Sequence, residues 1–241
     1  MPRPFEQWTV LPHGQLQALE DNILTVVGEL KMPLGEIPRR MTIVRLADGG
    51  LVIFNAIALD EQEMAAVERF GPPTWLIVPS DIHRMDAKTW KERYPKLTVV
   101  TPPGAREKVE KILPVDATAV DFADRNVELI SVPGCDGHEA ALEIRTLAGT
   151  TLVVNDLIWN LEDRPGFGGW IYHALGMTGG PPHLPGIIET RTVKDRDALR
   201  NQLLRWAALP DLNRILVSHG GVLTKDPRAL LKQMADQLLT H

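Results

Sequence analysis

Strand-length runs of Val, Ile and Leu recur along the chain, and a Gly, Pro, Asp or Asn bounds each of them. Runs of this length with such boundaries are typical of β-strands, so they constrain the fold strongly. They are residues 22–27, 41–46, 51–55, 75–79, 97–100, 127–132, 140–145, 151–155 and 214–218. Asp48-Gly49-Gly50 between the second and third runs predicts a hairpin turn.

Helical patterns lie between these runs. Asp60 is a good N-cap for a helix over 61–70, with Glu63 three residues on as in a capping box. Further helices are predicted over 86–94, 104–112, 194–208 and 227–239. Hairpins come first and strands alternate with helices later, which favours neither a doubly wound sheet nor a plain sandwich. The order predicts an α/β fold, a four-layer αββα sandwich of two mixed sheets with outer helices.

Length and composition limit the number of domains, the classes of partner and the compartment that we expect for this chain. The 241 residues, 44% of them hydrophobic, are long enough for a buried core, and we expect a single domain over 1–241. A net charge of -5 gives no electrostatic reason to expect a nucleic-acid partner. With a single cysteine there is no internal disulfide, which favours a reducing compartment. No apolar run approaches the ~18 residues that span a bilayer, and the first residues lack an apolar signal core. We therefore expect a cytoplasmic protein without a membrane partner.

Residues 162–185 interrupt the pattern, because they are dense in Gly and Pro and also contain Phe, Trp and Tyr. Long irregular loops are uncommon in compact domains and tend to be functional or disordered. We expect a loop that packs over a pocket as a lid, or else a plain surface excursion.

Three histidines and one aspartate share a topological setting. His83, His138 and His219 each follow a predicted strand, and Asp156 does the same. Metal and catalytic ligands often lie on loops at strand ends, because the sheet then fixes their direction. For each of these residues alone a structural role is the simpler interpretation, but together they favour a metal site.

The order of these landmarks resembles the metallo-β-lactamase superfamily, in particular a branch in which the metal motif is degenerate. The resemblance covers roughly residues 20–235. It rests on the first hairpin, on the strand and helix around Trp75 and Trp90, on Val132-Pro133-Gly134-Cys135, on the strand that ends in Asp156, and on the strand that ends in His219.

The family motif His-x-His-x-Asp-His is only partly present. In one register His83 is the last histidine of the motif, while Ile82 replaces the aspartate and Ser80 replaces a histidine. In a second register Asp81, His83 and Asp86 occupy three of the four ligand positions. His83 is retained in both.

The family's Pro-Gly-His segment is also altered. Cys135 stands in the place of its histidine, and His138 lies three residues further on. A thiolate is a good zinc ligand, so Cys135 is chemically able to substitute. The common alternative is a lone cysteine buried in the core.

The resemblance implies a metal-dependent hydrolase with a reduced, mononuclear site that acts on a small molecule. Two histidines and one carboxylate suffice for a single Zn²⁺ or Fe²⁺ with open coordination positions. The implied metal ligands are His83, Asp156 and His219, with His138 or Cys135 as a fourth. Asp81 and Asp86 are the candidates for the general base, and spacing selects neither.

Two alternatives stay open. The first is a non-catalytic binding or scaffolding protein of the same fold, with a decayed site and no ion. Ile82 and Met85 favour it, because apolar side chains cannot ligate hard metals. The second is an oxidoreductase with iron in the same triad. Fold relatives often pair, so a homodimer is also expected.

Overall fold

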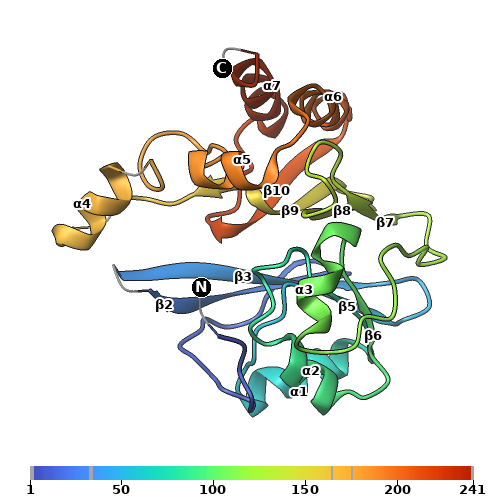
Figure 1. Ribbon diagram of the computed structural model, residues 1–241. Helices are drawn as coiled ribbons and strands as arrows, with labels where there is room; N and C mark the ends of the chain where they lie inside the picture. Colours follow the sequence, from blue (N-terminus) through green and yellow to red (C-terminus); the bar gives the residue numbers. More distant parts are fainter. Residues whose placement is uncertain (1–2, 33–34, 164, 175, 240–241) are drawn as a thin grey trace. The chain divides into compact units, whose positions relative to one another are not determined.

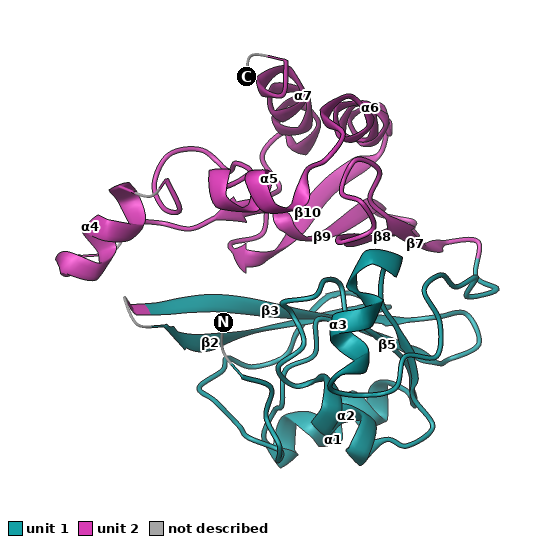
Figure 2. Ribbon diagram, viewed as in Figure 1, with its two compact units in different colours: residues 1–32, 36–124 teal, residues 33–35, 125–241 magenta. Residues whose placement is uncertain are grey.

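The computed structural model describes residues 3–32, 35–163, 165–174 and 176–239. The chain divides into two compact units (Figure 2): unit 1 comprises residues 1–32 and 36–124, and unit 2 comprises residues 33–35 and 125–241. Each unit has its own β-sheet, its own helices and its own hydrophobic core.

The sheet of unit 1 has six strands in the order β1-β2-β3-β4-β5-β6. Their bounds are Gln17–Glu20, Ile23–Met32, Gly35–Arg45, Leu51–Phe54, Pro73–Ile77 and Thr98–Val100. β3 pairs with β4 in antiparallel fashion across the predicted hairpin, whereas β4, β5 and β6 are parallel to one another. The sheet is therefore mixed.

Three α-helices accompany this sheet: α1 (Glu61–Phe70), α2 (Ala87–Arg93) and α3 (Arg106–Glu110), the last preceded by the 3₁₀ turn η1 (Pro103–Ala105). The Asp60 side chain accepts a hydrogen bond from the Glu63 amide at 2.9 Å, so the predicted N-cap of α1 is confirmed. Residues of these helices form the core of unit 1 together with alternate residues of β3, β4 and β5.

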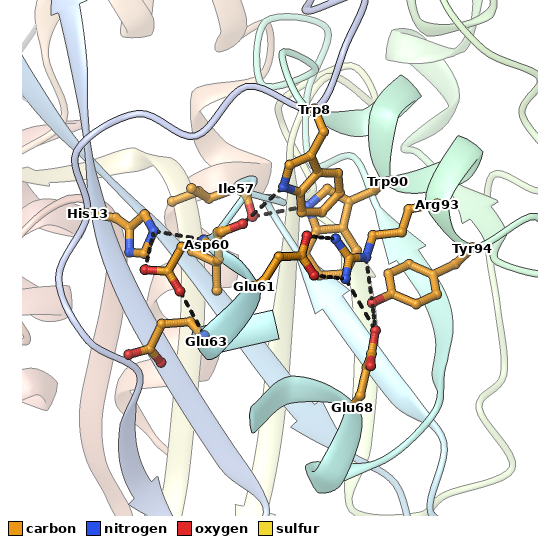
Figure 3. Close-up of polar contacts among 11 residues, drawn as sticks. Trp8, His13, Ile57, Asp60, Glu61, Glu63, Glu68, Trp90, Arg93 and Tyr94 are labelled. Carbon is orange, nitrogen blue, oxygen red and sulfur yellow. Dashed lines mark hydrogen bonds and ion pairs between the residues drawn. The ribbon is translucent and has the colours of Figure 1, made fainter. Parts of the chain in front are cut away.

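A segment before β1 ties α1 to α2 (Figure 3). The Trp8 indole donates a hydrogen bond to the Leu59 carbonyl at 2.9 Å, and its ring centroid lies 5.6 Å from that of Trp90. The Arg93 guanidinium lies 4.8 Å from the Trp8 ring centroid and binds both Glu61 carboxylate oxygens, at 2.7 and 2.8 Å. These contacts close the core of unit 1 on the side of its helices.

The sheet of unit 2 has four strands in the order β10-β9-β8-β7. Their bounds are Val127–Ser131 for β7, Ala140–Thr146 for β8, Gly149–Asn160 for β9 and Leu212–Gly220 for β10. β7, β8 and β9 form an antiparallel meander, and β10 returns parallel to β9.

Four helices belong to unit 2: α4 (Gly166–Ala174), α5 (Gly186–Thr192), α6 (Arg196–Ala207) and α7 (Pro227–Gln237). α6 and α7 lie side by side (Figure 1), and both contribute to the core that includes Leu152 and Val154 of β9. Within the described residues, no helix is long and apolar enough to cross a membrane.

The predicted α/β class with two mixed sheets and accompanying helices is confirmed, and each predicted strand is found. However, β2, β3 and β9 each extend five or six residues beyond one of their predicted ends, and β1 is an additional strand. The segment 162–185 is not the irregular loop that its composition suggests, because α4 lies within it. Two residues of this segment, Arg164 and Leu175, lie outside the described residues. Glycine has a low helix propensity, so the glycines at 166, 168 and 169 argue against a helix when the sequence is considered alone. The single-domain expectation stays a prediction.

Gly134, between β7 and β8, is a point of close approach in unit 2. Its φ is +83°, and its carbonyl accepts hydrogen bonds from the amides of Lys194 and Asp195 at 2.8 and 3.1 Å. A Cβ at this position would lie 2.3 Å from the Asp195 carbonyl oxygen. The turn that carries Cys135 and His138 is thereby fixed against the start of α6.

We expect Gly134→Ala to lower the free energy of unfolding by about 2–5 kcal/mol, because it adds a backbone clash to the cost of a left-handed conformation. Gly166→Ala is the matched control, since Gly166 has φ +88° and nothing within 4 Å of an added Cβ. The control should lose only about 1–2 kcal/mol. Urea unfolding of both variants measures the difference, and equal losses would contradict the close approach.

Candidate metal site

Asp156 lies in a bulge of β9 where that strand runs beside β10 (Figure 1). Val217 of β10 pairs with Val154, but His219 pairs with Trp159, so residues 155–158 of β9 face a single residue of β10. Bulges bend a strand and re-aim its side chains, and they are over-represented next to active sites. The apolar runs predict that β9 and β10 end before Asp156 and His219. Instead, both strands continue past these residues, because pairing resumes beyond the bulge.

The bulge brings Asp156 and His219 together inside unit 2. Asp156 Oδ1 lies 3.2 Å from His219 Nε2, and it accepts a hydrogen bond from the Trp159 indole at 3.3 Å. Asp156 is 1% and His219 6% exposed. The Trp159 and His219 ring centroids are 4.7 Å apart, so the indole also limits rotation of the imidazole.

The donor atoms of this pair, and the distance between them, are those expected of two ligands of one metal ion. Two ligands with bonds of ~2.0–2.1 Å to one tetrahedral ion have donor atoms roughly 3.3 Å apart. The observed separation of 3.2 Å between Asp156 Oδ1 and His219 Nε2 is close to that value. A carboxylate with an imidazole suits Zn²⁺ or Fe²⁺.

Three further polar residues surround the pair in unit 2. The Ser218 hydroxyl donates to Asn155 Oδ1 at 2.9 Å, and Asn155 Nδ2 lies 3.3 Å from Glu139 Oε2. The Asp156 amide donates to the same carboxylate oxygen at 3.4 Å. Glu139 and Asn155 were not predicted from the sequence, although Asn155 directly precedes Asp156 and Glu139 directly follows His138.

His83 belongs to unit 1, in the segment between β5 and α2, and it is half-buried. Its Nδ1 lies 3.1 Å from Asn55 Oδ1. Asn55 Nδ2 donates to the Arg40 carbonyl at 2.8 Å, which identifies Oδ1 as an acceptor. Nδ1 of His83 is therefore the donor to Asn55, and this contact orients the imidazole ring.

The two aspartates of the partial motif are both bound to cations of unit 1. Asp86 Oδ2 accepts from Arg39, and its Oδ1 accepts from the Ala58 amide at 3.1 Å. Burial raises the pKa of the Asp86 carboxyl, whereas Arg39 opposes that rise. Asp81 pairs with Lys108, whose side chain is half exposed.

Cys135 and His138 share the turn that precedes β8. Cys135 is fully buried in the core of unit 2, and burial together with the nearby charge of Glu139 raises the pKa of its thiol to about 12. The His138 amide donates to the Cys135 carbonyl at 2.8 Å, and the residue is half-buried. Cys135 is thus a protonated core residue at neutral pH.

We expect Arg39→Leu to destabilise the protein by about 3–5 kcal/mol, because it leaves the Asp86 carboxylate buried without a counter-charge. Among the described residues, Arg39 Nε and Nη2 have no hydrogen-bond partner, so the Asp86 bond is central to compensating this guanidinium. The double variant Arg39→Leu/Asp86→Leu should lose less than the single one. Thermal and urea unfolding measure both, and additive losses would exclude a coupled pair.

We expect the Cys135 thiol to resist alkylation in the native protein. Its pKa of about 12 lies well above the ~8.5 of an unfolded cysteine, so the thiolate fraction at pH 7 falls by about three thousandfold. Because Cys135 is the single cysteine, mass spectrometry after iodoacetamide gives a direct rate. Slow modification in buffer and fast modification in 6 M guanidinium are expected; rapid native labelling would show a thiolate.

Comparison with known proteins was made at the level of sequence and of structure. No protein-family model matches the sequence, and no curated protein matches it at the significance required. The fold is similar to the mono-zinc form of the metallo-β-lactamase FIM-1 from Pseudomonas aeruginosa, with a TM-score of 0.64, 14% identity, and coverage of 96% of this chain and 98% of that chain.

Two further solved structures give the same result. A metallo-β-lactamase from Erythrobacter litoralis has a TM-score of 0.61 and 13% identity, over 92% of this chain and 96% of its own. One from Hirschia baltica has a TM-score of 0.60 and 12% identity, over 93% of this chain and 98% of its own. Identities this low carry the fold and not the activity. The chain therefore has the fold of the metallo-β-lactamases, as the resemblance in its sequence implies.

Proposed function

We propose that this protein is a metal-dependent hydrolase of a small molecule, with a single ion held by His83, Asp156 and His219. The observation that carries the proposal is the buried Asp156–His219 pair, whose donor atoms have the spacing of two ligands of one ion. The mono-zinc form of FIM-1, a protein of the same fold, gives a precedent for one ion.

Each residue of the triad has a support that suits a ligand. Asn55 Oδ1 lies 3.1 Å from His83 Nδ1 and so orients the imidazole. Trp159 donates to Asp156 and packs against His219, so it limits the motion of both side chains. Such second contacts orient ligands and strengthen their affinity for the ion.

The ion would act as a Lewis acid on a substrate oxygen and would lower the pKa of water to near neutrality. Asp81 is the better candidate for the general base. Both carboxylate oxygens of Asp86 are engaged, one by Arg39 and one by the Ala58 amide. Asp81 pairs with Lys108, whose side chain is half exposed, whereas Asp86 pairs with the buried Arg39. His138 is a better fourth ligand than Cys135, because the Cys135 thiol stays protonated.

A second candidate function has its own support. Two carboxylates of the partial motif are bound to Arg39 and Lys108, and the Cys135 thiol is buried. Side chains that once ligated metal and now stabilise the fold are expected in a non-catalytic binding protein. In that case the protein would keep its fold without any ion.

Metal analysis of protein purified without a histidine tag separates the two candidates. For the hydrolase we expect about one Zn or Fe per chain, lost in both His83→Ala and His219→Ala. His173→Ala is the matched control, because His173 is an exposed histidine of α4 that pairs with Asp163. Its metal content should be unchanged.

Chelator provides the second measurement. An ion that binds only the folded state at 100 times its Kd adds about 2.7 kcal/mol, so EDTA should lower the melting temperature of the wild type. Metal-free protein with a melting temperature that ignores both chelator and added zinc would refute the hydrolase and support the binding protein. Iron with a visible absorption band would favour redox chemistry.

A further inference from the structure

The residues directly before the two unit 2 ligands are bonded to each other. Ser218 precedes His219 on β10, and Asn155 precedes Asp156 on β9. The Ser218 hydroxyl donates to Asn155 Oδ1 at 2.9 Å, and both side chains are buried. This bond crosses the bulge, where regular pairing between β9 and β10 is interrupted.

Glu139 extends this link to a third strand. It lies directly before β8 and is 1% exposed, and its carbonyl accepts from the Val132 amide at 2.9 Å, which holds its backbone in the β7–β8 turn. Its carboxylate lies 3.3–3.4 Å from Asn155 Nδ2 and 3.4 Å from the Asp156 amide. One side chain thus holds the side chain of Asn155 and the backbone of Asp156.

A buried carboxylate at this place has an electrostatic effect as well. Its charge adds to that of Asp156, and a divalent cation beside both would be stabilised by the two together. The same charge also disfavours the thiolate of Cys135, so it acts on a residue of the β7–β8 turn as well.

We propose that Glu139 is a positioning residue of the metal site, which sets the affinity for the ion by holding the Asn155–Asp156 bulge and, through Asn155, the Ser218–His219 end of β10. This inference rests on the proposed function, since it requires an ion at Asp156 and His219. Outer contacts of this kind typically change metal affinity by about 10- to 100-fold.

The test is a zinc titration of the full-length apoprotein in competition with a chromophoric chelator. Glu139→Gln keeps the size of the side chain and removes its charge, so we expect its zinc Kd to rise by about 10- to 100-fold. Glu143→Gln is the matched control. Glu143 lies on β8, the strand that Glu139 directly precedes, and is also fully buried, but it pairs with Arg145 and lies 3.9 Å from Arg205. Its zinc Kd should stay within about twofold of the wild type.

Stability is measured alongside, because a merely structural role predicts a different pattern. Under that alternative both variants lower the melting temperature of the apoprotein and neither changes the zinc Kd. Ser218→Ala is a milder probe in case Glu139→Gln does not fold, and removing its hydroxyl should raise the zinc Kd several-fold.

The outcomes separate the two proposals. Wild-type protein that does not bind zinc refutes the metal site itself. Wild-type protein that binds zinc, with an unchanged Kd in Glu139→Gln, refutes the role of Glu139. If Glu139→Gln does not fold, an unchanged Kd in Ser218→Ala refutes the network through which Glu139 acts.

Discussion

The parallel pairing of β9 with β10, interrupted by a bulge, is the constraint on which the candidate site depends. With regular pairing, the alternation of side chains along each strand would determine the directions in which the Asp156 and His219 side chains point. The extra residues of β9 break that alternation and allow the carboxylate to lie 3.2 Å from the imidazole. Because pairing resumes at Trp159, the bulge is fixed at both ends. The Trp159 indole also donates a hydrogen bond to the Asp156 carboxylate.

The polar residues around this bulge form a continuous network in unit 2. Ser218, Asn155 and Glu139 connect β10, β9 and β8, and all three side chains are buried. Buried polar groups are stabilising only when they are bonded, so such a network specifies one arrangement of its strands. A site assembled from β-strands in this way is more rigid than one assembled from loops alone.

In unit 1, two aspartates of the segment between β5 and α2 are bound to cations. Asp81 pairs with Lys108, and Asp86 pairs with Arg39. Arg39 comes from β3 and Lys108 from α3, so the segment between β5 and α2 is anchored near both ends. His83 lies between the two anchors and is oriented by Asn55. The segment therefore keeps its conformation through ion pairs as well as backbone contacts.

Sequence and structure contributed different parts of this account. The amino-acid sequence alone determined the α/β class, the strands β2 to β10, and the helices α1, α2, α3, α6 and α7, because apolar periodicity, caps and turn residues are local signals. It also selected His83, Asp156 and His219 as candidate ligands, because each comes directly after or soon after a recognisable apolar run, and this selection stays a prediction. It did not reveal β1, α5 or α4, and the glycines of α4 oppose helix formation.

Only the tertiary structure decided the roles of individual side chains. It assigned Asp86 to Arg39, Cys135 to the core, and Glu139 to the bulge, and the partners in these contacts are far apart in the chain or on different strands. The sequence pattern contains no information on the register shift between β9 and β10, since it arises from the packing of two strands that are more than 50 residues apart. Pairing across such distances is set by the folded chain as a whole, and the orientation of Asp156 toward His219 follows from it.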